Sequence, residues 1–335
     1  MKAMFKAQHS FTTKLISLVI VLLIFILISL CSGHSALSLQ RIPAILLGQG
    51  DFKENFIFYQ IRLPRMILTV LVGAALAFAG SILQGITKNP LADPGIIGVN
   101  AGSGLAIAIT FLFIPLEAQQ FGFILPLIGM LGGLIAGFFP YILSIRRFRG
   151  IQVVTYTLIG VGLATALSGA MMLIISATDR TKVDFIAKWL AGNLWGTDWQ
   201  YILGLFPWLF IIAGITLFKL HTLNLLQFDE TTAMNLGINL KTERMILLTL
   251  AILASASAAA IAGNISFIGL MAPHLAKRIV RPRFQQVLPV AVLLGAILLL
   301  IADTISRSIL PTPIPTGIIV AIIGAPYFLY LMKRV

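Results

Sequence analysis

The stretch that decides the fold is residues 15–31, LISLVIVLLIFILISLC, which carries no charged side chain. Residues 123–143, 153–175 and 316–331 form further apolar runs. An α-helix needs about 20 residues to cross a hydrocarbon core about 30 Å thick. Inside lipid the backbone must satisfy its own hydrogen bonds, so these runs are helices, and the alternation typical of a membrane barrel is absent. The sequence therefore predicts an all-α, polytopic membrane helix bundle.

The composition of the 335-residue chain agrees, because 59% of its residues are hydrophobic and only 10% are charged. A soluble domain carries about 25% charged residues. The net charge of +13 raises the alternative of a nucleic-acid partner, but the basic residues are spread between apolar runs and form no stripe. We therefore expect membrane lipid, and no nucleic acid, around this chain. Cys31 is the single cysteine, which excludes an intrachain disulfide.

The N-terminus allows two further interpretations. Lys2, Lys6 and Lys14 before the first apolar run are typical of a signal peptide, and residues 28–31 (ISLC) weakly resemble a lipoprotein cleavage site. Because many more apolar runs follow, the first run is predicted to be an uncleaved membrane helix.

Ten spans are predicted, and no linker is long enough to divide residues 1–335 into more than one transmembrane domain. The spans are residues 15–33, 66–86, 95–114, 123–143, 153–176, 201–219, 245–262, 265–280, 287–302 and 316–332. With both termini in the cytoplasm, sixteen of the 24 lysines and arginines lie in inside segments and eight outside. This asymmetry obeys the positive-inside rule and predicts a protein of the cytoplasmic (inner) membrane.

Small residues recur four apart in four of the predicted spans. The rows are Gly73, Ala77, Ser81 and Gly85; Gly129, Gly133 and Gly137; Gly160, Ala164 and Ser168; and Ala251, Ser255, Ala259 and Gly263. Such rows let helix backbones approach closely in lipid, so they predict a tightly packed bundle.

Catalytic and metal-binding patterns are missing from the sequence. The four histidines have no ligand spacing, and there is no Gly-x-Ser-x-Gly elbow and no phosphate loop. The chain is thus predicted to be no enzyme, to hold no metal or cofactor, and not to hydrolyse ATP itself. His274 is interpreted as a residue that caps or packs at a helix end, in preference to a proton relay.

Asp303 is the one acidic residue at the edge of a predicted span, four residues before Arg307. That spacing favours a local ion pair. Intramembrane carboxylates mark many ion-coupled carriers, so their scarcity makes a carrier driven by an ion gradient the weaker hypothesis. It stays open, since backbone carbonyls also bind sodium.

Three polar clusters remain. Residues 62–65 (RLPR), on the outside, suit either the carboxylates of an external partner or lipid phosphates. Residues 84–95 (QGITKNPLADPG), on the inside, predict a rigid turn, with Asp93 and Pro94 as a helix N-cap and first residue. Residues 228–237 (FDETTAMNLG) predict a short amphipathic helix, which is either a docking element or a solvated connector.

Six segments in order resemble the permease subunits of the iron-siderophore and vitamin B12 class of ABC importers, over roughly residues 15–335. They are residues 62–65, 73–84 (GAALAFAGSILQ), 89–94 (NPLADP), 263–274 (GNISFIGLMAPH), 302–307 (ADTISR) and 315–326 (PTGIIVAIIGAP). Besides the arginines, the residues of these motifs that we single out for a structural role are Gln84, Asn89, Pro90, Asp93, Pro94, Pro273, His274 and Asp303.

The resemblance implies a type II ABC importer permease fold and an importer of a ferric-siderophore complex. It implies a second permease chain, identical or homologous, two ATPase subunits that hold ATP and Mg, and an extracytoplasmic substrate-binding protein. Arg62, Arg65 and Arg307 would meet acidic residues of that binding protein. The fifth and tenth helices would line the pathway. The residues implied to couple to the ATPase are Asp229, Glu230, Thr231, Ala233, Leu236 and Gly237.

The chain departs from the family pattern at two places, with Phe228 where glycine is usual and Pro313 where glutamate is usual. Nothing in the sequence separates a siderophore from citrate, haem or cobalamin as the cargo.

Overall fold

The computed structural model describes residues 2–32, 39–114, 118–146, 150–151, 153–176, 180–194, 198–309 and 314–333. These residues form helices and one two-residue antiparallel strand pair, β1 (Ile145–Arg146) with β2 (Gly150–Ile151). The segment 311–313, which contains the departure at Pro313, lies outside the described residues.

Each of the ten predicted spans contains a helix. They are α1 (Lys2–Cys31), α4 (Leu63–Thr87), α5 (Val99–Phe113), α6 (Ala118–Ser144), α7 (Val153–Ser176), α9 (Trp199–Leu225), α11 (Leu240–Ala262), α12 (Ile268–Ile279), α13 (Phe284–Ser308) and α14 (Thr316–Met332). Seven described helices are long and apolar enough to cross a membrane. The helices α5, α12 and α14 are shorter, and the 12 residues of α12 rise only about 18 Å.

Shorter helices lie between the predicted spans. They are η1 (Leu39–Arg41), α2 (Ile42–Leu46), α3 (Phe52–Phe56), the π-helical η2 (Ile57–Arg62), α8 (Arg180–Leu190) and α10 (Glu230–Asn235). Of these, only α10 was predicted. The sequence of α8, RTKVDFIAKWL, carries four charged residues, so its composition does not indicate a buried helix. The helix nevertheless buries Ile186 and Trp189.

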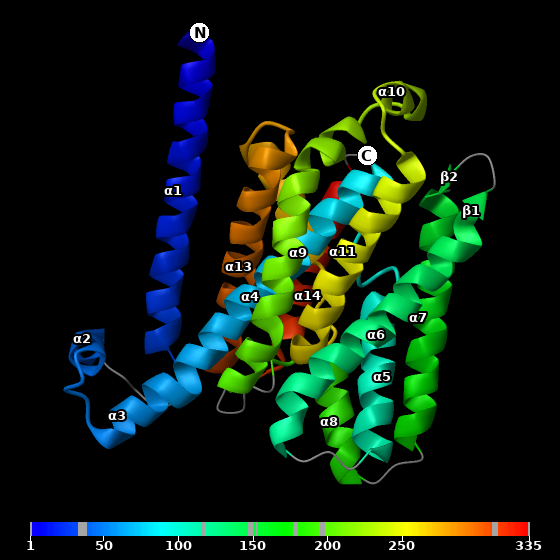
Figure 1. The fold of residues 1–335 in the computed structure, drawn as a ribbon. Helices are drawn as coiled ribbons and strands as arrows, with labels where there is room; N and C mark the ends of the chain where they lie inside the picture. Colours follow the sequence, from blue (N-terminus) through cyan, green and yellow to red (C-terminus); the bar gives the residue numbers. More distant parts are fainter. Residues whose placement is uncertain are drawn as a thin grey trace.

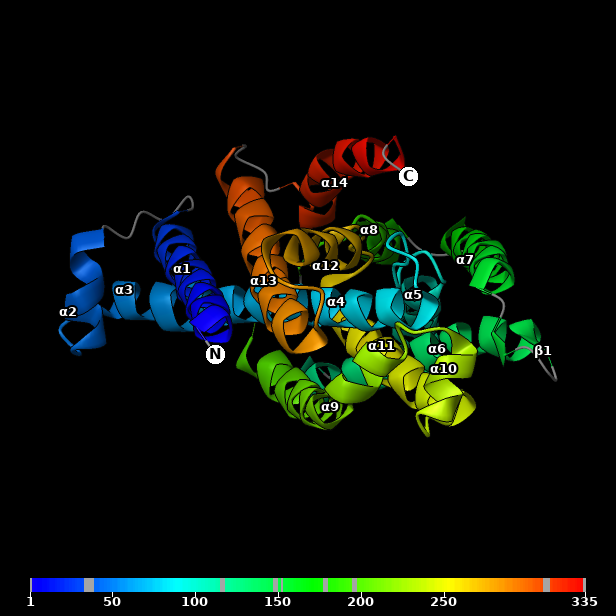
Figure 2. The same cartoon turned by 90° about the horizontal axis from the view of Figure 1, so that it is seen from above.

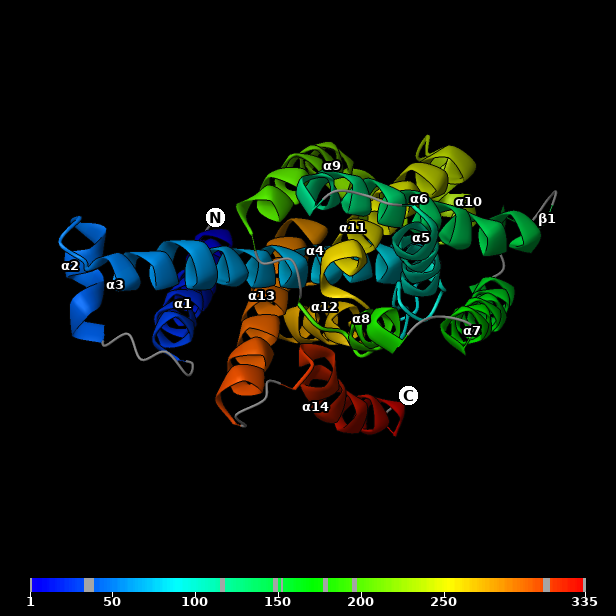
Figure 3. The same cartoon turned by 90° about the horizontal axis from the view of Figure 1, so that it is seen from below.

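The helices α4 and α11 form the centre of the bundle. In each of them, 78% of the residues in an apolar 18-residue stretch are buried. Seen along the bundle, α4 runs through the middle, between α9 and α11 on one side and α12, α13 and α14 on the other (Figures 2 and 3). The helices α1 and α7 lie at the periphery and bury only 11% of such a stretch. Their exposed apolar faces suit lipid or another membrane chain.

Close helix crossings occur where the sequence places glycine. A Cβ on Gly73 would lie 2.4 Å from the carbonyl oxygen of Gly295 in α13, and one on Gly80 would lie 1.9 Å from that of Gly269 in α12. The row on α6 packs against α11 in the same way, with Gly133 against Ala256. These contacts confirm the packing role of the rows on α4 and α6. In the α11 row, Ala251, Ser255 and Ala259 are buried in the bundle.

The row on α7 behaves differently from the other three. Gly160 packs against Ile97, but Ser168 is exposed, so the row contacts the bundle only at its first part. Its remaining small residues lie on an open face.

The ends of the chain and the short helices separate into two groups. Figure 1 shows both termini, α10 and the β1–β2 pair at one end of the bundle, and α2, α3 and α8 at the other. Near the α8 end, α14 begins beside the segments after α8 and α11: the Gly317 amide donates to the Gly192 carbonyl (2.6 Å) and the Asn264 amide to the Trp189 carbonyl (3.1 Å).

Candidate functional site

At the end of the bundle that holds α2 and α3, three helices converge on the carboxylate of Asp303. Arg65 of α4 donates from Nη2 to Oδ1 (2.8 Å), Arg307 of α13 from Nε to Oδ2 (2.9 Å), and Thr316 of α14 from Oγ1 to Oδ1 (3.2 Å). Asp303 is fully buried, whereas the Arg65 and Arg307 side chains keep 19% and 14% of their surface exposed. The predicted ion pair between Asp303 and Arg307 is confirmed.

Arg62 belongs to the same region but is more buried, with 6% of its surface exposed. Its guanidinium donates to the carbonyl of Leu30, and it lies close enough to Arg307 for the two charges to repel. Arg307 also donates to the Ser29 hydroxyl (2.9 Å), so the cluster fastens α1 to α4 and α13. The structure thus brings together all three arginines predicted to dock a partner, with Arg65 and Arg307 the more accessible.

At the opposite end, the predicted amphipathic helix exists as α10, with Asp229 at its N-cap position and Gly237 just beyond its end at φ +85°. Ala233 is buried against the bundle. The other residues predicted to couple to a partner are exposed, namely Asp229, Glu230, Thr231, Leu236 and Gly237.

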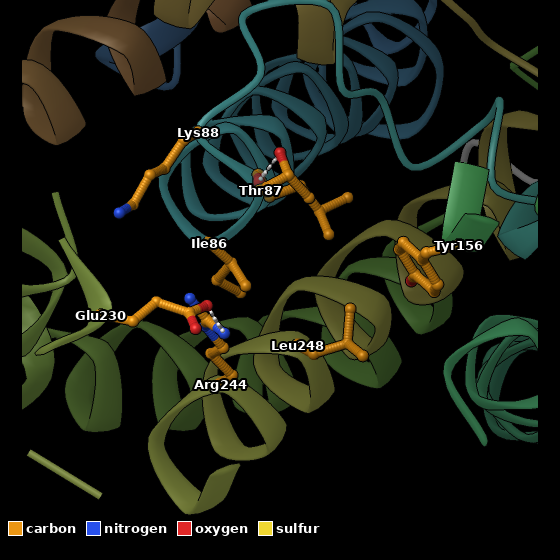
Figure 4. Close-up of a pocket in the computed structure, with 8 residues that line it drawn as sticks. Ile86, Thr87, Lys88, Tyr156, Glu230, Arg244 and Leu248 are labelled. Carbon is orange, nitrogen blue, oxygen red and sulfur yellow. Dashed lines mark hydrogen bonds and ion pairs between the residues drawn. The ribbon is translucent and has the colours of Figure 1, made fainter. Parts of the chain in front are cut away.

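Two side chains of the bundle hold the segment that begins α10. Arg244 of α11, which is 7% exposed, donates from Nη1 to Oε1 of Glu230 (2.9 Å). Lys88, at the end of α4, donates to the Phe228 carbonyl (2.5 Å). Figure 4 shows the ion pair between Glu230 and Arg244 in the wall of a cavity that is also lined by Ile86 and Leu248.

The loop of residues 88–98 forms the predicted turn, because the Oδ1 atom of Asn89 accepts the amide of Leu91 (2.9 Å) right after Pro90. The predicted helix start at Asp93 and Pro94 is wrong. The helix α5 begins at Val99, after a left-handed Gly98.

Asp93 instead accepts the amide of Gly95 (2.7 Å) and a backbone hydrogen bond from Leu270 in the first turn of α12. Its carboxylate is therefore bonded to α12, a helix distant in sequence, and residues 94–98 remain turns. Burial raises the pKa of Asp93 to about 6, although the N–H groups that donate to it act in the opposite direction.

The raised pKa gives a testable pH dependence. Since the ordinary pKa is 3.8, the folded protein binds this proton more tightly than the unfolded chain. The resulting stabilisation is complete below about pH 4 and is lost as the pH rises through about 6. Relative to the Asp93→Asn variant, we expect the wild type to lose up to about 3 kcal/mol of unfolding free energy across this range. Thermal unfolding in detergent across a pH series measures it, and parallel profiles for the two proteins would contradict it.

The other motif residues have packing roles. The Gln84 side chain donates to the Leu270 carbonyl (3.2 Å) and accepts from Lys277 (3.2 Å), which joins α4 to α12. His274 packs edge-on against Tyr327 of α14, with 6.1 Å between ring centres, which agrees with the packing interpretation. Among the described residues, no three His, Cys, Asp or Glu side chains are grouped to hold a metal ion.

Arg244 and Thr316 are site residues that no pattern in the sequence indicates. Thr316 lies 13 residues from Asp303 and Arg244 lies 14 from Glu230. The two residues of each pair lie in different helices, so no helical periodicity predicts their contact.

A family model of the FecCD transport family matches residues 21–334. The chain belongs to the FecCD transport family. The FecCD relatives include the iron(3+)-hydroxamate import system permease protein FhuG of Bacillus subtilis (strain 168), 37% identical over 322 residues, which are 95% of each chain. The Fe(3+)-citrate import system permease protein YfmE of the same organism is 38% identical over 335 residues, 99% of this chain and 98% of the relative.

A third relative is the Fe(3+) dicitrate transport system permease protein FecD of Escherichia coli (strain K12), 36% identical over 94% of this chain and 99% of the relative. A solved structure described as a metal-chelate type ABC transporter in an inward-facing conformation has a TM-score of 0.82 and 31% identity, and covers 97% of this chain and 100% of its own. This FecCD protein therefore has the permease fold that the resemblance implied, and it is a multi-pass protein of the cytoplasmic membrane.

Proposed function

We propose that this chain is the permease subunit of an ABC importer that carries a ferric-siderophore complex across the cytoplasmic membrane. The observation that carries the proposal is the FecCD match over residues 21–334. The relatives are named for iron(3+)-hydroxamate and Fe(3+)-citrate import. Ferric chelates of this kind are therefore the first candidates, and haem or cobalamin is the alternative.

The charge distribution supports an orientation with both termini and α10 in the cytoplasm. In this orientation Arg65 and Arg307 face the extracytoplasmic side, where their partial exposure suits acidic residues of a substrate-binding protein. Arg62 adds a third positive charge, which is more deeply buried. The net positive charge of the cluster favours an acidic partner and opposes a basic one.

The cytoplasmic end offers an apolar surface on and beside α10. Phe228, Met234 and Leu236 are 53%, 51% and 54% exposed, which is a high exposure for large apolar side chains grouped on one short segment. We assign this surface to the ATPase subunit, which would hold ATP and Mg. Asp229, Glu230 and Thr231 would supply its polar rim.

The exposed face of α7 suits the pathway or a second permease chain. Gly162 and Gly169 have no atom near the Cβ positions that a side chain would occupy, so this face is open in the single chain. Together with α14, it would border the route of the cargo once two permease chains pair.

The test is iron uptake by proteoliposomes that contain the permease, its ATPase and its binding protein. We expect radioactive iron to enter from ferric hydroxamate or ferric citrate only when ATP is supplied. Replacing the phosphate-loop lysine of the partner ATPase should abolish uptake and serves as the control. Uptake that follows a proton or sodium gradient without ATP would establish the ion-driven carrier instead, and transport of haem or cobalamin alone would correct the cargo.

A further inference from the structure

We propose that Asp303 is a positioning residue that transmits the docking of the binding protein to the start of α14. The inference rests on the proposed function and extends it, because it links the docking arginines to a helix proposed to border the pathway. The arginines are held by the same carboxylate that holds the first turn of α14.

Arg65, Arg307 and Thr316 share one carboxylate, that of Asp303. The Oδ1 atom of Asp303 accepts from both Arg65 and Thr316, while its Oδ2 atom accepts from Arg307. With no exposed surface, Asp303 depends on these donors for the stabilisation of its charge. A change at the arginines therefore changes the Thr316 contact.

The helix α14 begins without a side-chain cap. Pro315 stands at its N-cap and provides no side-chain hydrogen bond to the helix. Thr316 is fully buried and reaches Asp303, while the segment just before it is tied to α13, where the Ser306 hydroxyl donates to the Ile314 carbonyl. The start of α14 is thus attached to α13 through residues within one turn of Asp303.

A docked protein competes with Asp303 for the guanidiniums of Arg65 and Arg307. Arg65 and Arg307 retain exposed surface, so carboxylates of a docked protein reach them from outside. Each carboxylate that pairs with an arginine weakens its bond to Asp303, and a buried carboxylate with less compensation is costly. Asp303 responds by altering its hold on Thr316, and docking thereby shifts the balance between two positions of α14.

The experiment compares Thr316→Val with Thr69→Val in the complete complex in nanodiscs. Thr316→Val removes one hydroxyl and keeps every ion pair. Thr69 is also fully buried, but its hydroxyl donates to the Arg65 carbonyl on its own helix (2.7 Å). Two quantities are measured: the affinity for the binding protein loaded with ferric citrate, and the ratio of ATPase rates with and without it.

For Thr316→Val we expect unchanged docking affinity and a ratio lower by about fivefold, within the range that the net contribution of one typical hydrogen bond supplies. Thr69→Val should match the wild type, and Thr316→Ser should restore the ratio. Asp303→Asn, checked for folding by size-exclusion chromatography, should lower the ratio as well.

A normal ratio in Thr316→Val, or a loss of docking affinity equal to the loss of the ratio, would overturn the inference. A wild-type complex that neither docks the binding protein nor raises its ATPase rate would instead refute the proposed function, so the two failures are distinct.

Discussion

The Gly80→Ala variant is expected to yield little assembled permease. A Cβ at this position would lie 1.9 Å from the carbonyl oxygen of Gly269, and 2.5 and 2.6 Å from its carbonyl carbon and Cα. All three are backbone atoms, so no side chain can turn away to make room. We expect the free energy of unfolding to fall by more than about 3 kcal/mol, the upper end of the usual cost of overpacking, because α4 and α12 must separate.

The chemistry of α12 explains why the two backbones approach so closely. Pro273 has no N–H, so the carbonyl of Gly269, four residues earlier, lacks its usual donor in the helix. That carbonyl lies directly against Gly80, where a Cα–H group contacts it. Separating the helices would also strain the bonds of Gln84 and Asp93 to Leu270.

The matched control is Gly214→Ala on α9, where no atom outside its own helix lies within 4 Å of the added Cβ. Alanine favours a helix over glycine, so this variant should assemble at least as well as the wild type. Thermal unfolding and size-exclusion chromatography in detergent measure both. If Gly80→Ala assembled like Gly214→Ala, the close approach of α4 and α12 at Gly80 would be contradicted.

This crossing also shows how far the sequence predicts the packing. The four-residue spacing identified Gly73 correctly, but Gly80 falls outside that row, seven residues further along α4. Spacing along one helix shows which small residues share a face, whereas the position of the partner helix determines which of them contacts a backbone. The missing donor at Pro273 is visible in the sequence, but its consequence depends on where α4 crosses.

The candidate sites divide in the same way. The pair of Asp303 with Arg307 lies within one helix and follows from its four-residue spacing. The pair with Arg65 joins residues 238 positions apart, and no periodicity predicts it. The sequence likewise predicts α10 from its amphipathic pattern, while the hold of Arg244 on it depends on how α11 packs. At Asp93 the local pattern predicted a cap for the next helix, but tertiary contact assigned the carboxylate to α12.

The second large effect is expected at Arg244, where Arg244→Leu should separate ATP hydrolysis from transport. Arg244 is nine-tenths buried and fixes Glu230 in the first turn of α10, so its loss frees one side of the helix that we assign to the ATPase contact. A hydrogen bond between charged groups contributes about 1.5–3 kcal/mol, so iron uptake should fall by roughly tenfold or more. ATP hydrolysis by the complex should continue.

The control is Lys241→Leu, which removes an exposed positive charge from the same turn of α11. It should leave both uptake and hydrolysis near wild-type rates. Exchanging the two charges, in the double variant Glu230→Arg with Arg244→Glu, should restore part of the uptake, because the ion pair reforms in reverse. Equal losses of uptake and hydrolysis in Arg244→Leu would mean that Arg244 stabilises the bundle as a whole. Rescue by the exchange would then not occur, and the coupling role of α10 would have to rest on its exposed apolar residues alone.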